Sequence, residues 1–207
     1  MLLSRIRYTA LVGAGLFATA GNASAHHLMG GKTPSTFTEG ILSGIGHPII
    51  GPDHLAFLVA LGIAVGVGRL SLVTPFLFLV AMACGVAAHV AALNIPAAEL
   101  IVAVSVLTAG VLLVLDRRIT ASAWAAIFTI AGFFHGYAYG ESIYGAEATP
   151  LAAYLVGLVV VQTALAVGIA FATRAVWTAS GIGPRLVGAA ICGVGFTALV
   201  GQIIPAP

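Results

Sequence analysis

The stretch GHPIIGPDHLAF, residues 46–57, places two imidazoles and a carboxylate inside an apolar part of the chain, at His47, Asp53 and His54. The apolar segment around it, residues 40–68, is longer than the roughly 20 residues with which a helix crosses a bilayer. Two prolines and a glycine interrupt the stretch, and proline both removes a backbone donor and clashes with the preceding turn. We therefore expect the first membrane helix to be broken between His47 and Asp53.

The expected break has a chemical use. On a straight helix His47 and His54 would share a face but lie roughly 10 Å apart along the axis, at about 1.5 Å per residue. Two imidazoles at that separation are too far apart to bind one ion. An unwound turn between them would bring them together.

The composition of the whole chain is that of an integral membrane protein. Of 207 residues, 60% are hydrophobic and 7% are charged, whereas a soluble domain carries about a quarter charged residues. The formal net charge of +2 is small and the basic residues are scattered, which excludes a nucleic-acid-binding protein. The partner that this composition predicts is the lipid bilayer.

The first 25 residues predict a cleaved signal peptide. Arg5 and Arg7 precede the apolar run YTALVGAGLFATA, and a small-residue cleavage site ends at Ala25. Cleavage there would start the mature chain at His26, outside the cytoplasm. An uncleaved first helix is the alternative, because signal anchors share the same charged and apolar regions.

The hydropathy of the remaining chain predicts an all-α fold, a polytopic bundle of six transmembrane helices with the first helix broken. Each apolar stretch is near the roughly 20 residues that cross about 30 Å of hydrocarbon. The six stretches are residues 40–68, 72–93, 97–115, 120–139, 150–173 and 185–204. No internal repeat or soluble domain interrupts them, so we expect residues 26–207 to form a single membrane domain.

Loop charges predict how the bundle is oriented. If the mature N-terminus is outside, every loop arginine falls on the cytoplasmic side and the outer segments hold only Lys32 among the basic residues, as the positive-inside rule requires. These loop arginines are Arg69, Arg117, Arg118, Arg174 and Arg185. We therefore expect a multi-pass protein of the cytoplasmic (inner) membrane, with its mature N- and C-termini on the outer, periplasmic side.

Titratable side chains converge on the outer half of the predicted bundle. Counted at about 1.5 Å per residue from the cytoplasmic ends, His54 lies about 21 Å up the first span and His135 about 23 Å up the fourth. His89, Glu99 and Glu141 also fall near the outer ends of their spans. Ionisable groups in hydrocarbon are costly and usually mark ion or proton pathways. The sequence therefore predicts a site at this depth.

The residue types at this depth favour a divalent metal ion. Imidazole and carboxylate together, without thiolates, suit nickel, cobalt or zinc and fit poorly with copper(I), and ligand type does not choose among the three. His26 and His27 are a second candidate, for capture of metal outside, because a free α-amine and two imidazoles would meet at the mature N-terminus. The alternative is that these two histidines merely follow a cleavage site.

Two motifs resemble those of a known family. HPIIGPDH is similar to the H-x5-D-H signature in the first helix of the HupE/UreJ family of nickel and cobalt permeases. FFHGYAYGES resembles the second signature of that family, FHG-x-A-x-G-x-E, and the resemblance covers essentially the whole mature chain. It implies a secondary permease that brings nickel, or cobalt, inward for metalloenzymes such as hydrogenase or urease, with no permanently bound cofactor.

The resemblance also implies metal-binding residues, position by position. The first motif matches His47, Asp53 and His54, and the second matches His135 and Glu141. Two further titratable residues, His89 and Glu99, are pathway candidates. The chain departs from the family at Tyr139, where many members have histidine, and a phenol is a far weaker ligand at neutral pH.

Other function classes stay open beside a transporter. An intramembrane zinc metalloenzyme would use the same histidines to activate a water, with Asp53 or Glu141 as general base, although no H-E-x-x-H pattern is present. A non-transporting accessory protein, or a channel for a small neutral solute, would use them in proton relay or gating. The chain has no G-x-x-x-x-G-K-[ST] loop, so we expect no ATPase, and we expect a transporter rather than an enzyme.

Overall fold

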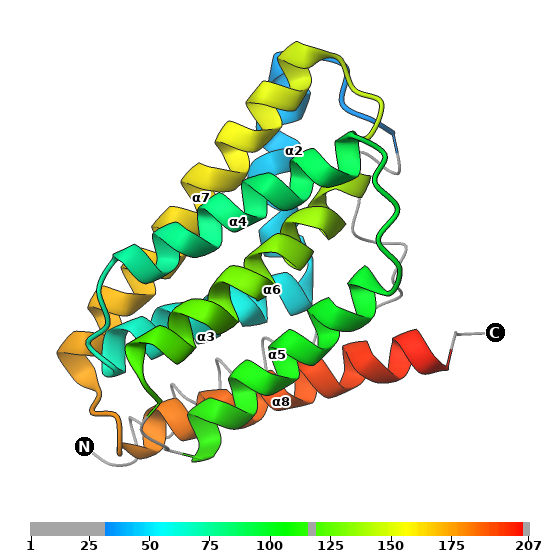
Figure 1. Cartoon of the computed structure of the whole chain (residues 1–207). Coiled ribbons are helices and arrows are strands. Elements are labelled where there is room, and N and C mark those ends of the chain that lie inside the picture. The colour runs from blue at the N-terminus through cyan, green and yellow to red at the C-terminus, as the bar shows by residue number, and fades with distance from the viewer. Residues whose placement is uncertain (1–31, 116–118, 205–207) are drawn as a thin grey trace.

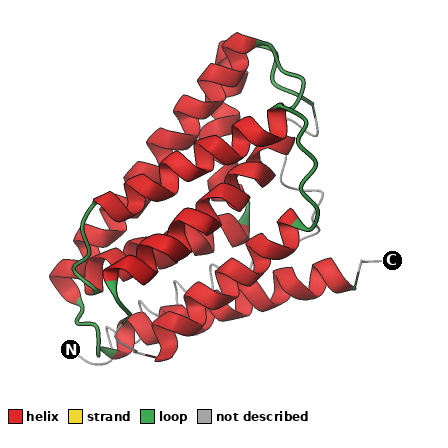
Figure 2. Ribbon diagram, viewed as in Figure 1, coloured by secondary structure: helices red, strands yellow, loops and turns green. Residues whose placement is uncertain are grey.

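The computed structural model describes residues 32–115 and 119–204, and all regular structure in these two segments is helical (Figure 2). The described helices are α2 (Phe37–Ile50), α3 (Pro52–Val67), α4 (Val73–Val90), α5 (Ala98–Leu115), α6 (Ala121–Glu141), α7 (Ala148–Val176) and α8 (Ile182–Ile203). The predicted all-α class is confirmed. The predicted signal peptide, residues 1–25, and the capture candidates His26 and His27 lie outside the described residues.

The first predicted span is broken at the histidine-rich stretch, as expected. Helix α2 ends at Ile50, α3 begins at Pro52, and the two helices are bent by 77°. Pro48 lies in the last turn of α2, and Pro52 occupies the first turn of α3, where a missing backbone N–H costs nothing. Gly51 between them has extended backbone angles, so the chain changes direction at this residue.

Both ends of the bent pair are fixed by hydrogen bonds. At the start of α2, the Thr36 hydroxyl accepts from the backbone N–H of Glu39, and the Glu39 carboxylate accepts from the backbone N–H of Thr36, which forms a capping box. At the end of α3, Arg174 of α7 donates to the carbonyl of Leu70 at 2.6 Å. Hydrogen bonds therefore hold the start of α2 and the turn that follows α3.

Small residues allow close packing of the helices. Helix α4 packs on α6, α5 lies beside α8, and α7 runs along both α2 and α3 (Figure 1). A Cβ added at Gly136 of α6 would collide with the backbone carbonyl of Met82 of α4. A Cβ added at Gly44 of α2 would collide with the carbonyl of Tyr154 of α7. Such close approach is typical of membrane helix pairs, where small residues stand at the interface.

The number of membrane spans is supported only in part. Helices α4, α5, α7 and α8 are long and apolar enough to cross a membrane, and the bent pair α2–α3 makes a fifth if it counts as one span. Helix α6 covers the predicted fourth span, residues 120–139, and is 21 residues long, but it does not reach the same hydropathy. The described chain is thus a multi-pass bundle with four to five candidate spans, and the sixth stays a prediction.

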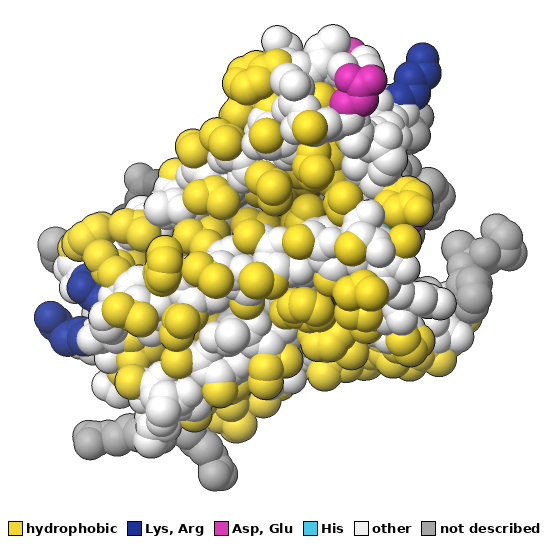
Figure 3. All heavy atoms as spheres, turned by 45° about the horizontal axis from the view of Figure 1, so that its top comes forward, with side chains coloured by type: hydrophobic (Ala, Val, Ile, Leu, Met, Phe, Trp, Pro, Cys, Tyr) yellow, Lys and Arg dark blue, Asp and Glu magenta, His cyan; other side chains and the backbone are white. Residues whose placement is uncertain are grey.

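Charged side chains gather at opposite ends of an otherwise apolar surface (Figure 3). The acidic end, where α2, α5 and α7 begin, carries Lys32, Glu39, Glu99, Glu141 and Glu147. The basic end, where α3 and α7 end, carries Arg69, Arg174 and Arg185. This separation within the described residues is the pattern on which the predicted orientation depends.

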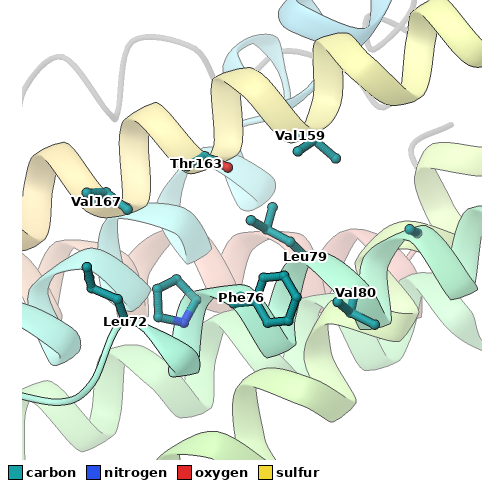
Figure 4. A pocket seen from close by; sticks show the side chains of 9 residues that line it. Leu72, Phe76, Leu79, Val80, Val159, Thr163 and Val167 are labelled. Carbon is teal, nitrogen blue, oxygen red and sulfur yellow. The ribbon is translucent and has the colours of Figure 1, made fainter.

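An apolar groove separates α4 from α7 on the outer face of the bundle (Figure 4). Its lining residues are apolar except for one threonine: Leu72, Pro75, Phe76, Leu79, Val80, Ala83, Val159, Thr163 and Val167. A groove of this composition matches the acyl chains of a bilayer and carries no group that binds an ion. The candidate site lies elsewhere, at the helix break.

Candidate functional site

The helix break brings His47 and His54 together. His47 lies in the last turn of α2 and His54 in the first turn of α3, with 5.6 Å between their ring centroids. Both side chains are buried. A Cβ added at Gly51 would lie 2.7 Å from Cδ2 of His54, so a side chain at this position would displace the imidazole. The approach of the two histidines that the sequence predicted is confirmed.

A third histidine joins them from α6. Nδ1 of His54 and Nδ1 of His135 are 2.9 Å apart, and His135 is fully buried. The sequence placed these two residues at one depth in the membrane, and the structure places them in direct contact. We call His47, His54 and His135 the histidine cluster.

Hydrogen bonds to neighbouring groups orient the rings of His135 and His54. Ser105 of α5 donates through its hydroxyl to the carbonyl of Val102 at 2.7 Å, so the Ser105 oxygen accepts from Nε2 of His135 at 3.0 Å. His135 therefore carries its proton on Nε2 and directs a lone pair on Nδ1 toward His54. His54 then donates through its own Nδ1.

The same reasoning applies to His47. The Tyr154 hydroxyl of α7 donates to the carbonyl of Tyr139 at 2.8 Å, so it accepts from Nδ1 of His47 at 3.1 Å. The Ser142 hydroxyl lies 3.0 Å from the same nitrogen. His47 therefore carries a proton on Nδ1. The neutral imidazole is the form of each of these residues that binds a metal ion.

Aromatic rings enclose the histidine cluster. The ring of Tyr139 lies 4.4 Å from that of His54 and 5.0 Å from that of His47, and the ring of Phe57 lies 4.5 Å from that of His135. Tyr139 is fully buried, and its hydroxyl has no hydrogen-bond partner within residues 32–115 and 119–204. The position at which the chain departs from the family is thus part of the wall of the cluster.

Three carboxylates lie toward the acidic end. Asp53 accepts from the backbone N–H of His54 at 2.8 Å, which fixes the carboxylate at the start of α3. Asp53 and Glu141 are both near enough to Glu99 to act on it electrostatically, and Asp53 also acts on His135. Glu141 is exposed, whereas Asp53 and Glu99 are partly buried. Of the three predicted carboxylates, Asp53 is thus the one that contacts a residue of the cluster directly.

His89 lies apart from the histidine cluster. Its ring, near the end of α4, packs against Tyr137 at 4.6 Å and Tyr144 at 5.9 Å. Tyr137 in turn donates to the carbonyl of Leu93 and accepts from the N–H of Ile95, which holds the connection between α4 and α5. In the part of the chain that the structure describes, no three His, Cys, Asp or Glu side chains stand in a metal-ligating arrangement.

Three side chains that orient the cluster were not predicted from the sequence, namely Ser105, Ser142 and Tyr154. Ser105 and Tyr154 each interrupt an apolar run, in IVAVSVLTAG and PLAAYLVG. Ser142 stands at the last position of the second signature, where the family has glutamate, and Glu141 precedes it by one residue. Polar groups within membrane helices usually hydrogen-bond across to another helix. The sequence therefore indicates that these side chains form hydrogen bonds between helices, but it does not show with which residues.

Comparison with known proteins agrees with the two motifs. The family described as HupE / UreJ protein matches residues 14–198, which include the whole histidine cluster. Protein HupE of Rhizobium leguminosarum bv. viciae is similar at 27% identity over 166 residues, which make up 79% of this chain and 86% of that protein. No solved structure matches the chain significantly. Because the family match extends over well more than half of its length, the chain belongs to the HupE / UreJ protein family.

Proposed function

We propose that this protein is a secondary transporter that imports divalent nickel across the cytoplasmic membrane, with cobalt and zinc as competing ions. The observation that carries the proposal is the histidine cluster: three buried imidazoles meet at a helix break, and Asp53 directly precedes one of them. The ion is cargo, and no resident cofactor is needed. Metalloenzymes such as hydrogenase or urease would receive it.

The spacing of two cluster nitrogens supports ion binding. Two nitrogens bound at right angles to one ion, each about 2.1 Å from it, stand about 3.0 Å apart. The Nδ1 atoms of His54 and His135 are 2.9 Å apart. Binding through both atoms requires only that His54 carry its proton on Nε2 instead of Nδ1, and that the rings turn their lone pairs toward the ion.

The broken helix adds favourable electrostatics. The last carbonyls of α2 have no partners within their own helix, and the C-terminal end of a helix dipole attracts a cation. Discontinuous helices whose ends meet an ion in the middle of the membrane are common in secondary transporters. Asp53, Glu99 and Glu141 at the acidic side would draw a cation toward the cluster.

Transport requires the bundle to move. Beyond His135, the aromatic side chains of Phe57, Phe78 and Phe128 are at most 1% exposed and pack against one another. These rings would have to move apart for an ion to pass between them toward the basic end. Because Gly51 joins two helices bent by 77°, we propose that the break is the hinge about which access alternates.

Uptake of labelled metal into proteoliposomes tests the proposal. We expect concentration-dependent uptake of nickel, competition by cobalt and zinc, and a response to a pH gradient if the ion is exchanged for protons. The control is liposomes without protein. Absence of uptake of all three metals would overturn the transporter proposal and favour the accessory class, and hydrolytic activity that depends on zinc would favour the metalloenzyme.

The proposed orientation predicts a labelling pattern. It places six helices in the membrane, with α6 as the fourth span, cleavage after Ala25, and the acidic end on the periplasmic side. Cysteines introduced at Ser122 and Ala148, both exposed at helix starts, should react with an impermeant reagent from the cytoplasm and from outside, respectively. Cys84 and Cys192 are first replaced by alanine. The reverse labelling pattern would contradict the orientation.

A further inference from the structure

Gln162, in the middle of α7, is a fully buried polar side chain outside the histidine cluster. It is 0% exposed, and neither its Nε2 nor its Oε1 has a hydrogen-bond partner among the described residues. The amide offers two donor hydrogens and a carbonyl oxygen with two lone pairs. Because nearly all buried amides in proteins are hydrogen-bonded, a buried amide without partners requires an explanation.

Contacts on either side place Gln162 opposite the helix break. One turn earlier on α7, the backbone nitrogen of Leu158 would lie 3.0 Å from a Cβ added at Gly44 of α2. One turn later, the carbonyl oxygen of Ala166 would lie 3.0 Å from a Cβ added at Gly62 of α3. The packing of α7 therefore passes from α2 to α3 at the level of Gln162.

Gln162 also lies further along α7, toward the basic end, than the residue of α7 that contacts the histidine cluster. Tyr154, which hydrogen-bonds to His47, is eight residues earlier on α7, or about 12 Å along the helix. Leu158 belongs to the apolar cluster around Tyr139 and Tyr154, whereas Ala166 belongs to the larger apolar core. The amide is thus a polar group between two apolar clusters, at the level of the break.

We propose that Gln162 binds the divalent cation after it leaves the histidine cluster, as a second, weaker station toward the basic end. This inference rests on the proposed transport function. The amide carbonyl would bind the ion or a water that the ion retains. The ion, or the water that it retains, would then bond to the buried amide during transport.

An amide is suited to this position because it binds a borderline cation less tightly than imidazole does. An ion that met only tight sites would enter readily but leave slowly, and conduction needs sites weak enough to release it. A second station built from oxygen atoms would take the ion from the cluster without trapping it. A bare apolar segment at this depth would instead present a barrier to a charged ion.

The test compares two substitutions of neighbouring polar residues on α7. Gln162→Leu removes the amide at similar volume, and Thr163→Val is the matched control, because Thr163 lines the apolar groove. In proteoliposomes we expect Gln162→Leu to lower the maximal rate of nickel uptake by about tenfold or more, the effect of losing one hydrogen bond to a charged group. Thr163→Val should keep the wild-type rate.

Two further measurements separate a transport role from a structural one. The dissociation constant of nickel for the purified protein should be unchanged in Gln162→Leu, because the histidine cluster is intact. The melting temperature should be equal or higher, because the substitution removes buried polar atoms that have no partners. Gln162→Glu keeps an oxygen at the same position and should recover part of the lost rate.

Each other result would overturn the inference. Wild-type uptake by Gln162→Leu would remove the second station while leaving the transporter proposal intact. A parallel fall of melting temperature and uptake would show that Gln162 only supports the fold. An equal loss in Gln162→Leu and Gln162→Glu would exclude an oxygen ligand. If the wild-type protein transports no metal, the proposed function and this inference fail together.

Discussion

Replacing either His54 or His135 with alanine should reduce nickel uptake by about 100-fold or more. Loss of a residue that only orients a metal ligand typically costs about 10- to 100-fold in affinity, so loss of a ligand itself should cost at least as much. The two Nδ1 atoms lie 2.9 Å apart and would share one ion. The measurement is the initial rate of uptake of labelled nickel, with the dissociation constant determined on the purified protein.

His89→Ala is the matched control for this prediction. This substitution also removes an imidazole near the outer end of a predicted span. His89, however, packs against Tyr137 and Tyr144 and is not part of the histidine cluster. The double substitution of His54 and His135 should be little worse than either single one, because residues that act as a unit are not additive. Additive losses, or uptake by His135→Ala at the control rate, would show that the pair does not share an ion.

Replacing Gly136 with leucine should prevent the native packing of α6 on α4. A Cβ at this position would collide with the backbone carbonyl of Met82, and a backbone clash cannot be relieved by a change of rotamer. Overpacking of an ordinary core costs about 1–3 kcal/mol, and we expect a cost at or above the upper end of that range. The measurement is the melting temperature of the purified protein in detergent, together with the fraction that elutes as a single folded species.

Gly168→Leu is the control for bulk alone. Gly168 is on α7, it is exposed, and an added Cβ would have nothing within 4 Å. We expect its melting temperature to stay near that of the wild-type protein. Because Gly136 directly follows His135, the milder Gly136→Ala should lower nickel uptake even where the protein still folds. A Gly136→Leu protein as stable as Gly168→Leu would mean that α4 and α6 do not pack as closely as described.

Local chemistry made some features predictable from the sequence alone. The excess of apolar residues identified a membrane protein, because hydrocarbon accepts few charged side chains. The prolines at positions 48 and 52 predicted the break between α2 and α3, because proline acts on the backbone of its own helix whatever packs around it. The similar depth of His54 and His135 followed from residue counts, because a helix rises by a fixed distance per residue.

The sequence by itself thus determined the membrane class, the helix break and the depth of the histidines, whereas the tertiary structure decided which side chains meet at that depth. His89 and His135 both lie near the outer ends of their predicted spans, yet only His135 joins the histidine cluster, while Ser105 and Tyr154 arrive from other helices to orient it. The physical reason is that a helix that is apolar on every side has no polar face, so its sequence does not show which side faces the interior of the bundle. Its rotation is set by close backbone contacts with its neighbours, such as that of Gly136 with Met82, and these depend on the whole bundle.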